Sequence, residues 1–175
     1  MRGCLMQIKS DNAEVVESKK SFDINRAKKL NARIKILRME KALEGLDNCI
    51  HMNDPDTPLT HHFADGLYGR EIFIPKGYCL TTGIHATEHI AIISKGKCTV
   101  VSEDGIVDLE APHTMVTKIG TKRAIYVHED LVWTTVHLNP DNENDIDKLV
   151  SMISFKNFKE YLDFDSLQAQ VGCDK

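Results

Sequence analysis

Three histidines are the side chains best suited to metal or acid-base chemistry in this sequence. His85 and His89 lie close together, and His137 follows later in the chain. Two neutral imidazoles with a third donor can hold a divalent transition metal such as iron, manganese, nickel or zinc. We therefore take His85, His89 and His137 as a candidate metal set. Without a metal, His85 or His89 could act as a general acid or base, which makes this pair the catalytic candidates.

A second group of cationic and aromatic side chains is suited to binding an anion. A guanidinium offers paired donors to a phosphate or carboxylate, and it has no lone pair for a metal. Aromatic rings can supply a flat face for a sugar or a base. The candidate ligand-binding residues are Arg123, Tyr68, Arg70, Tyr126, Trp133 and Lys122.

Structural roles are open for several of these residues. Arg123 could instead pair with an acid at the rim of a barrel, such as Glu71 or Glu110. Lys122 could be a solvated turn residue, and Trp133 could belong to the core.

Short runs rich in β-branched and aromatic residues dominate the middle of the chain. Their close spacing predicts a compact antiparallel barrel over residues 59–138. Turns are expected where Lys95-Gly96 and Glu129-Asp130 separate two runs. Trp133, Thr135 and His137 alternate on the final run and would share one face. The expected strands cover 67–74, 78–82, 89–94, 97–102, 106–109, 114–117, 123–128 and 131–137.

Helical patterns flank this barrel on both sides. Within 23–48 the residues Ala27, Leu30, Ile34 and Leu37 form an apolar stripe, which predicts an N-terminal amphipathic helix. Residues 1–22 are expected to be loosely ordered. Residues 141–170 predict C-terminal helices that cover an open edge of the barrel. The fold class expected is mainly β, a single-domain antiparallel β-barrel of the jelly-roll type with helices at both ends.

Composition and charge narrow the classes of function. A chain of 175 residues with 42% hydrophobic content can bury one core. Its five cysteines form no C-x-x-C pair, so we expect a reducing, cytoplasmic compartment. No apolar run is long enough to span a membrane. The net charge is −4, yet residues 19–41 hold nine Lys or Arg against two acids. The rest of the chain, which includes the barrel, therefore carries a net negative charge, and nucleic acid is disfavoured as a partner. The basic helix is expected to serve packing or oligomer contacts.

The intervals between certain residues resemble the first motif of the cupin superfamily, G-x5-H-x-H-x3/4-E-x6-G. The matching positions are Gly77, Gly83, His85, His89 and Gly96. Gly83 stands where the motif has its first histidine, and His89 stands where it has glutamate. The second motif, G-x5-P-x-G-x2-H-x3-N, falls on Pro112, Lys118, Gly120, Arg123 and Val127. Only Gly120 is kept there, and Arg123 replaces the last metal histidine.

Strings at 87–89, 93–96, 120–123 and 133–135 also look like a group of small cupin-domain proteins often encoded by tailed bacteriophages. Such an origin would place the protein in a host cytoplasm. The cupin resemblance implies that His85, His89 and Arg123 point into the barrel and converge on a pocket in its mouth. It also implies a homodimer or a higher homo-oligomer.

Three functions follow from these expectations. The first is a binding protein whose pocket recognises a small anion, either a sugar phosphate or a nucleotide, with sequestration of a host nucleotide signal as one use. The second is an enzyme in which His85 and His89 hold a divalent metal or act as acid and base in an isomerase or epimerase reaction. The third is a structural barrel that oligomerises without a ligand.

Overall fold

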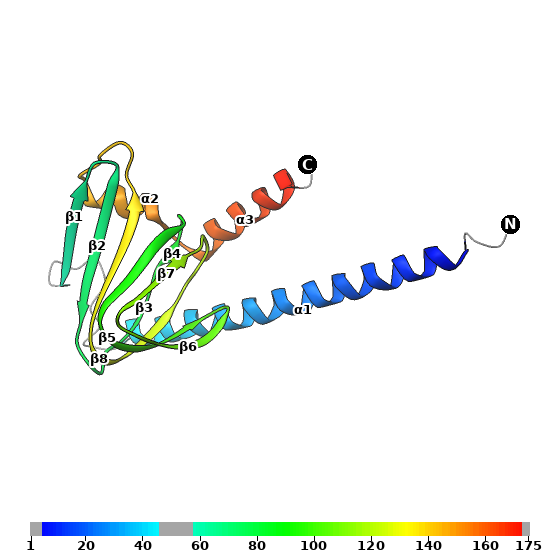
Figure 1. The fold of residues 1–175 in the computed structure, drawn as a ribbon, viewed down its shortest axis with the longest axis horizontal. Helices are drawn as coiled ribbons and strands as arrows, with labels where there is room; N and C mark the ends of the chain where they lie inside the picture. The colour runs from blue at the N-terminus through cyan, green and yellow to red at the C-terminus, as the bar shows by residue number, and fades with distance from the viewer. Residues whose placement is uncertain (1–4, 46–57, 173–175) are drawn as a thin grey trace.

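A computed structural model of the chain describes residues 5–45 and 58–172. Figure 1 shows a curled sheet with helix α1 at one end and helix α2 at the other. No helix in the described part of the chain is long and apolar enough to cross a membrane. The elements in chain order are α1 (Leu5–Glu44), β1 (Leu59–Ala64), β2 (Leu67–Ile74), β3 (Cys79–Thr81), β4 (Ile84–His85), β5 (His89–Ser102), β6 (Gly105–Glu110), β7 (His113–Thr117), β8 (Ala124–Leu138), α2 (Ile146–Ile153), β9 (Ser154–Phe155) and α3 (Phe158–Gly172).

The strands form an antiparallel sheet that folds over on itself. Its main path runs β1-β2-β8-β5-β6, with β3 also paired to β8 and β7 also paired to β5. The long strands β5 and β8 pair with each other, and each takes different partners at its two ends. This pairing is that of a jelly-roll type barrel, so the predicted mainly β, antiparallel fold class is confirmed. Strands β4 and β9 form a separate small sheet.

Two turns that the sequence predicts are bends within continuous strands. The runs 89–94 and 97–102 both belong to β5, and most of 123–128 joins 131–137 in β8. The pairing of β5 with β8 shifts register between Ile93 and Cys98. Gly96 adopts a φ of +89° there, and a Cβ on it would lie 2.8 Å from the carbonyl carbon of Asp130. The glycine therefore lets the two long strands cross closely while they bend.

The helix α1 differs from the expected one in its start and in its buried face. It begins at Leu5, so residues expected to be loosely ordered belong to the helix. Leu30, a member of the predicted apolar stripe, is 45% exposed, whereas Arg33 and Ile36 are buried. Helix α1 contacts β3 and β5, and its Arg33 also contacts Tyr161 of α3. The packed face of α1 therefore centres on Arg33 and Ile36, and of the predicted stripe only Ile34 and Leu37 are half-buried.

The expected C-terminal helical segment contains α2 and α3. Asp145 caps α2, because its carboxylate accepts hydrogen bonds from the backbone N–H groups of Asp147 and Lys148. Leu149 and Ile153 of α2 are buried and pack with Tyr68 of β2. The chain then adds β9 beside β4 before α3 begins. The C-terminal segment therefore packs against one end of the barrel.

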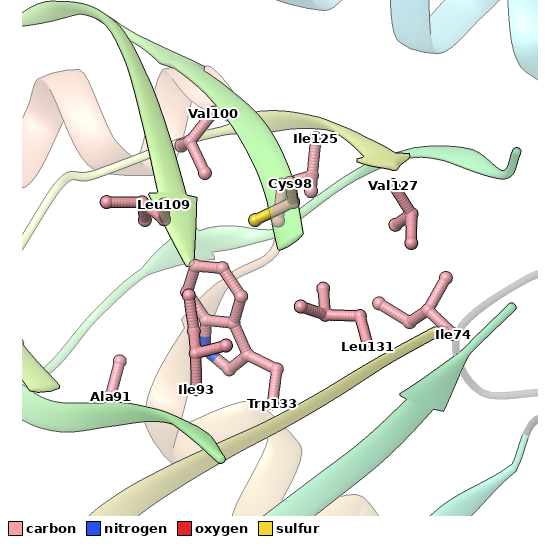
Figure 2. Packing of buried hydrophobic residues seen from close by; sticks show 10 residues of the cluster. All are labelled: Ile74, Ala91, Ile93, Cys98, Val100, Leu109, Ile125, Val127, Leu131 and Trp133. Carbon is pink, nitrogen blue, oxygen red and sulfur yellow. The ribbon is translucent and has the colours of Figure 1, made fainter. Parts of the chain in front are cut away.

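The core lies between the strands of the folded sheet. Figure 2 shows the side chains of this core, with Trp133 beside Ile93 and with Leu131 near Ile74. In β5 the buried residues Ala91 and Ile93 alternate with residues that face outward. Trp133 therefore belongs to the core, which was the structural alternative for this residue, and it also lines a pocket inside the barrel.

Candidate ligand pocket

A cavity of about 110 Å³ lies inside the barrel, and Ile74, Ile125 and Trp133 of the core line part of it. Its apolar walls include Ile72 and Ile74 of β2, Ile125 and Trp133 of β8, and Ile153 of α2. No Asp or Glu belongs to the lining among the described residues. The polar lining consists of Arg70, Thr82, His85, Arg123, Thr135, His137 and Ser154.

Strand alternation and register bring most of these groups together. On β2 the inward positions include Arg70 and Ile72, which pair with Thr135 and Trp133 on β8. On β8 the residues Trp133, Thr135 and His137 alternate, and all three line the pocket, as their spacing predicts. The predicted shared face of Trp133, Thr135 and His137 therefore lines the pocket.

Arg123 lies just before β8 and directs its guanidinium into the barrel. The residue is only 7% exposed. Its Nη2 donates a hydrogen bond to Thr117 Oγ1 at 2.9 Å, and its guanidinium carbon lies 5.8 Å from the centre of the Trp133 ring. Burial lowers its pKa, while more distant acids oppose that shift weakly. Because a guanidinium stays charged in proteins, this pocket holds a largely desolvated cation.

Glu71 and Glu110, the two acids considered as partners of Arg123, contact other residues instead. Glu71 accepts a hydrogen bond from Thr134 at 3.1 Å, and Glu110 pairs with Lys97 at 3.3 Å. Within the described part of the chain, neither acid forms an ion pair with Arg123.

Arg70 adds a second guanidinium to the same lining. It lies on β2, and burial lowers its pKa, with a smaller opposing effect from Tyr68. Two guanidiniums therefore line the same small cavity.

The three candidate histidines form one cluster at this wall. The ring centres of His85 and His89 are 4.6 Å apart, and those of His89 and His137 are 4.2 Å apart. His85 and His137 line the pocket, and His89 is buried. Burial and then the nearby His89 lower the pKa of His85 to about 2 and that of His137 to about 3. Burial also lowers the pKa of His89. These imidazoles are therefore neutral near pH 7.

The cluster does not have the arrangement of a metal site. Among the described residues, no three His, Cys, Asp or Glu side chains are placed to hold a metal ion. His89 Nδ1 lies 3.0 Å from the carbonyl oxygen of Thr87, and both ring nitrogens of His137 lie near threonine hydroxyls. The guanidinium of Arg123 adds a positive charge that repels a cation. The candidate metal set is thus brought together, but the groups present do not fit a bound metal.

Three candidate ligand-binding residues lie outside the pocket lining. Lys122 is 3% exposed and donates to Glu40 Oε1 of α1 at 2.6 Å, so it is neither a pocket ligand nor a solvated turn residue. Tyr68 is fully buried, and its hydroxyl lies 2.7 Å from Nδ1 of His61. Tyr126 is 47% exposed, because its neighbours in β8 face inward. Of the candidate set, Arg70, Arg123 and Trp133 line the pocket.

The pocket also includes residues that the sequence analysis did not single out. Thr82 follows β3, and Ser154 comes from β9 in the C-terminal segment. A Cβ on Gly83 would lie 3.3 Å from Ser154 Oγ, which is a tight contact. Strand β9 therefore occupies the space beside the position where the cupin motif has its first histidine. Strand alternation cannot reveal Ser154, because its place depends on pairing with a strand some 70 residues away.

Comparisons with known proteins find similarity among solved structures. No protein-family model matches the chain. No curated protein matches it either. The similar solved structures include a cupin 2 conserved barrel domain protein from Salinispora arenicola, at 15% identity and a TM-score of 0.42, which covers 61% of this chain and 92% of that one. Another is an RmlC-like cupin family protein with a double-stranded β-helix fold from Methanocaldococcus jannaschii, at 16% identity and a TM-score of 0.39, which covers 55% of this chain and 96% of that one.

An enzyme is also among the similar structures. Salicylate 1,2-dioxygenase from Pseudoaminobacter salicylatoxidans is 13% identical, with a TM-score of 0.46. The match covers 69% of this chain and 34% of the dioxygenase. At this level of similarity the function has to be argued from the pocket itself.

Proposed function

We propose that this protein binds a small anionic molecule in the barrel pocket through Arg70 and Arg123. The observation that carries the proposal is the buried guanidinium of Arg123, which lines the pocket together with the half-buried Arg70. An anion beside a desolvated guanidinium offsets the hydration that burial removes from it. Guanidiniums also match the paired oxygens of a carboxylate or phosphate.

The rest of the lining suits a ligand that carries hydroxyl groups and one flat or apolar face. Neutral His85 can donate or accept a hydrogen bond without adding charge, and neutral His137 adds no charge to the lining either. Thr82, Thr135 and Ser154 add hydroxyls, and Trp133 adds an aromatic surface. Sugar phosphates and nucleotides have these features. A cavity of about 110 Å³ holds the anionic group and a small part of such a ligand, so the remainder of a nucleotide would extend out of the cavity.

Binding is better supported than catalysis by His85 and His89. A general base works best when its pKa lies near the pH of the reaction, and burial lowers the pKa of His85 to about 2. The described residues also form no arrangement of three metal ligands.

A thermal-shift screen of the full chain tests the proposal. The panel contains inorganic phosphate, small carboxylates, sugar phosphates and nucleotides at millimolar concentration. A ligand at about one hundred times its Kd stabilises the folded state by about 2.7 kcal/mol, which is a clear rise in melting temperature. If no member of the panel changes the melting temperature, the proposal is wrong.

Charge-removing variants locate the binding site. Arg70→Gln and Arg123→Gln should each weaken binding of the ligand that the screen finds, as measured by calorimetry. Lys118→Gln is the control, because Lys118 is an exposed cation outside the lining. Equal affinity in all three variants would place the ligand elsewhere on the protein.

A further inference from the structure

A buried ion pair joins helix α1 to the segment that carries Arg123. Lys122 Nζ lies 2.6 Å from Glu40 Oε1, with the lysine side chain 3% exposed and the glutamate 29% exposed. The hydroxyl of Thr81 donates to the same carboxylate oxygen at 3.1 Å. Among the described ion pairs, Glu40 is the carboxylate that neutralises Lys122. Without Glu40, a buried ammonium would be unpaired, which is strongly unfavourable.

The same lysine also holds the wall of the pocket. Lys122 Nζ donates to the carbonyl oxygen of Thr82 at 2.7 Å. Thr82 in turn is joined to Arg123 twice: its N–H donates to the Arg123 carbonyl at 2.9 Å, and its hydroxyl accepts from the Arg123 N–H at 3.0 Å. Both Thr82 and Arg123 line the pocket. A continuous chain of polar contacts therefore runs from Glu40 to the backbone of Arg123.

Only the C-terminal part of α1 takes part in this series of polar contacts. Figure 1 shows α1 reaching the barrel at its C-terminal end and projecting away from it toward the N-terminus. Helix α1 contacts β3, which ends at Thr81, and Glu40 near the end of the helix accepts the hydrogen bond from Thr81. The position of the helix end and the position of Thr82 are thereby linked.

We propose that Glu40 is a positioning residue for the pocket, so that docking of α1 sets the place of the Arg123 guanidinium. The effect on ligand binding rests on the proposed anion function, whereas the effect on pocket geometry does not. Because coupling between two binding events is reciprocal, an anion in the pocket should also stabilise the docked end of α1.

Trp133 allows this coupling to be measured without a ligand. It is the single tryptophan of the chain, it is 6% exposed, and the Arg123 guanidinium carbon lies 5.8 Å from its ring centre. Its fluorescence therefore reports on the packing of the pocket and on the nearby cation. A change confined to the surface of α1 should leave this emission unaltered.

The test compares Glu40→Gln with Glu44→Gln in the full chain. Glu44 lies one turn further along α1 and is exposed, so its variant removes the same charge without touching Lys122. We expect Glu40→Gln to move the Trp133 emission to longer wavelength and to increase its quenching by iodide, while Glu44→Gln matches the wild type. Lys122→Met breaks the same series of polar contacts at the lysine and should give the same change in Trp133 emission. Unchanged emission in folded Glu40→Gln or Lys122→Met would overturn the coupling.

Calorimetry with the anion found in the screen gives the second readout. Glu40→Gln should weaken its binding about tenfold, equivalent to about 1.4 kcal/mol, with Glu44→Gln unchanged. Glu40→Asp keeps the charge and should restore part of the affinity. Wild-type affinity in Glu40→Gln would contradict the positioning role. If the wild type binds no anion, the proposed function fails, and the fluorescence comparison still decides whether Glu40 positions the pocket.

Discussion

The guanidinium of Arg33 in α1 donates a hydrogen bond to the carboxylate of Glu103, between β5 and β6, at 2.6 Å. The same guanidinium donates to the carbonyl of Gly120 and lies 4.4 Å from the centre of the Tyr161 ring of α3. Arg33 is 4% exposed. One side chain therefore joins the N-terminal helix, the barrel and the C-terminal helix.

Removal of this arginine should destabilise the whole protein. Arg33→Met leaves the largely buried Glu103 carboxylate without its cation, and the loss of one partner of a buried pair costs about 3–5 kcal/mol. Urea denaturation followed by circular dichroism measures the change. Lys29→Met is the matched control, because the Lys29–Asp104 pair is exposed and is worth less than about 1 kcal/mol. Similar losses of stability in both variants would show that Arg33 does not join the two helices to the barrel.

Gly120 should tolerate alanine much less well than Gly77. Both have a positive φ, +82° and +86°, so alanine at either position costs about 1–2 kcal/mol of backbone strain. Only at Gly120 would the new Cβ also come within 3 Å of the Tyr161 ring; at Gly77 nothing lies within 4 Å. Denaturation should therefore show a larger loss for Gly120→Ala.

A double variant isolates the ring contact. Gly120→Ala combined with Tyr161→Ala should lose less stability than the two single changes added together, because the second change removes the clash. Additive losses would mean that the ring does not limit this position.

The neutral histidines predict a loss of stability in mild acid. Above pH 6.5 the unfolded histidines are neutral, as are the folded ones, whose pKa values are lowered to about 2 for His85 and about 3 for His137. Below pH 6.5 the unfolded chain takes up protons that these folded residues do not. The free energy of unfolding should therefore fall as the pH drops from 6.5 to 5, by up to about 1.4 kcal/mol per pH unit for each histidine.

Urea denaturation at several pH values between 7.5 and 5 measures this slope. His85→Asn should reduce it by the share of one histidine, since asparagine does not titrate. A slope that is unchanged in His85→Asn would mean that His85 takes up its proton in the folded state as readily as in the unfolded one.

Much of the barrel was predictable because strands leave a local pattern. The run 67–74 coincides with β2, and the alternation of Trp133, Thr135 and His137 places all three in the pocket. The same alternation, applied to Tyr126, would have placed that ring outside, since Ile125 and Val127 beside it are buried. Gly77, Gly96 and Gly120, which match the cupin spacing, all adopt a positive φ.

Strand alternation in the sequence predicted the antiparallel barrel and the shared face of Trp133, Thr135 and His137, because burial repeats every second residue along a strand. The meeting of the histidines with Arg123 was implied by the cupin resemblance. Only the tertiary structure decided that Lys122 faces Glu40 rather than a ligand, that Ser154 enters the pocket, and that α1 docks through Arg33. These contacts join residues 82, 69 and 87 positions apart, for Lys122–Glu40, Ser154–His85 and Arg33–Gly120 respectively. Such pairings leave no periodic signal, because they depend on where the folded elements meet.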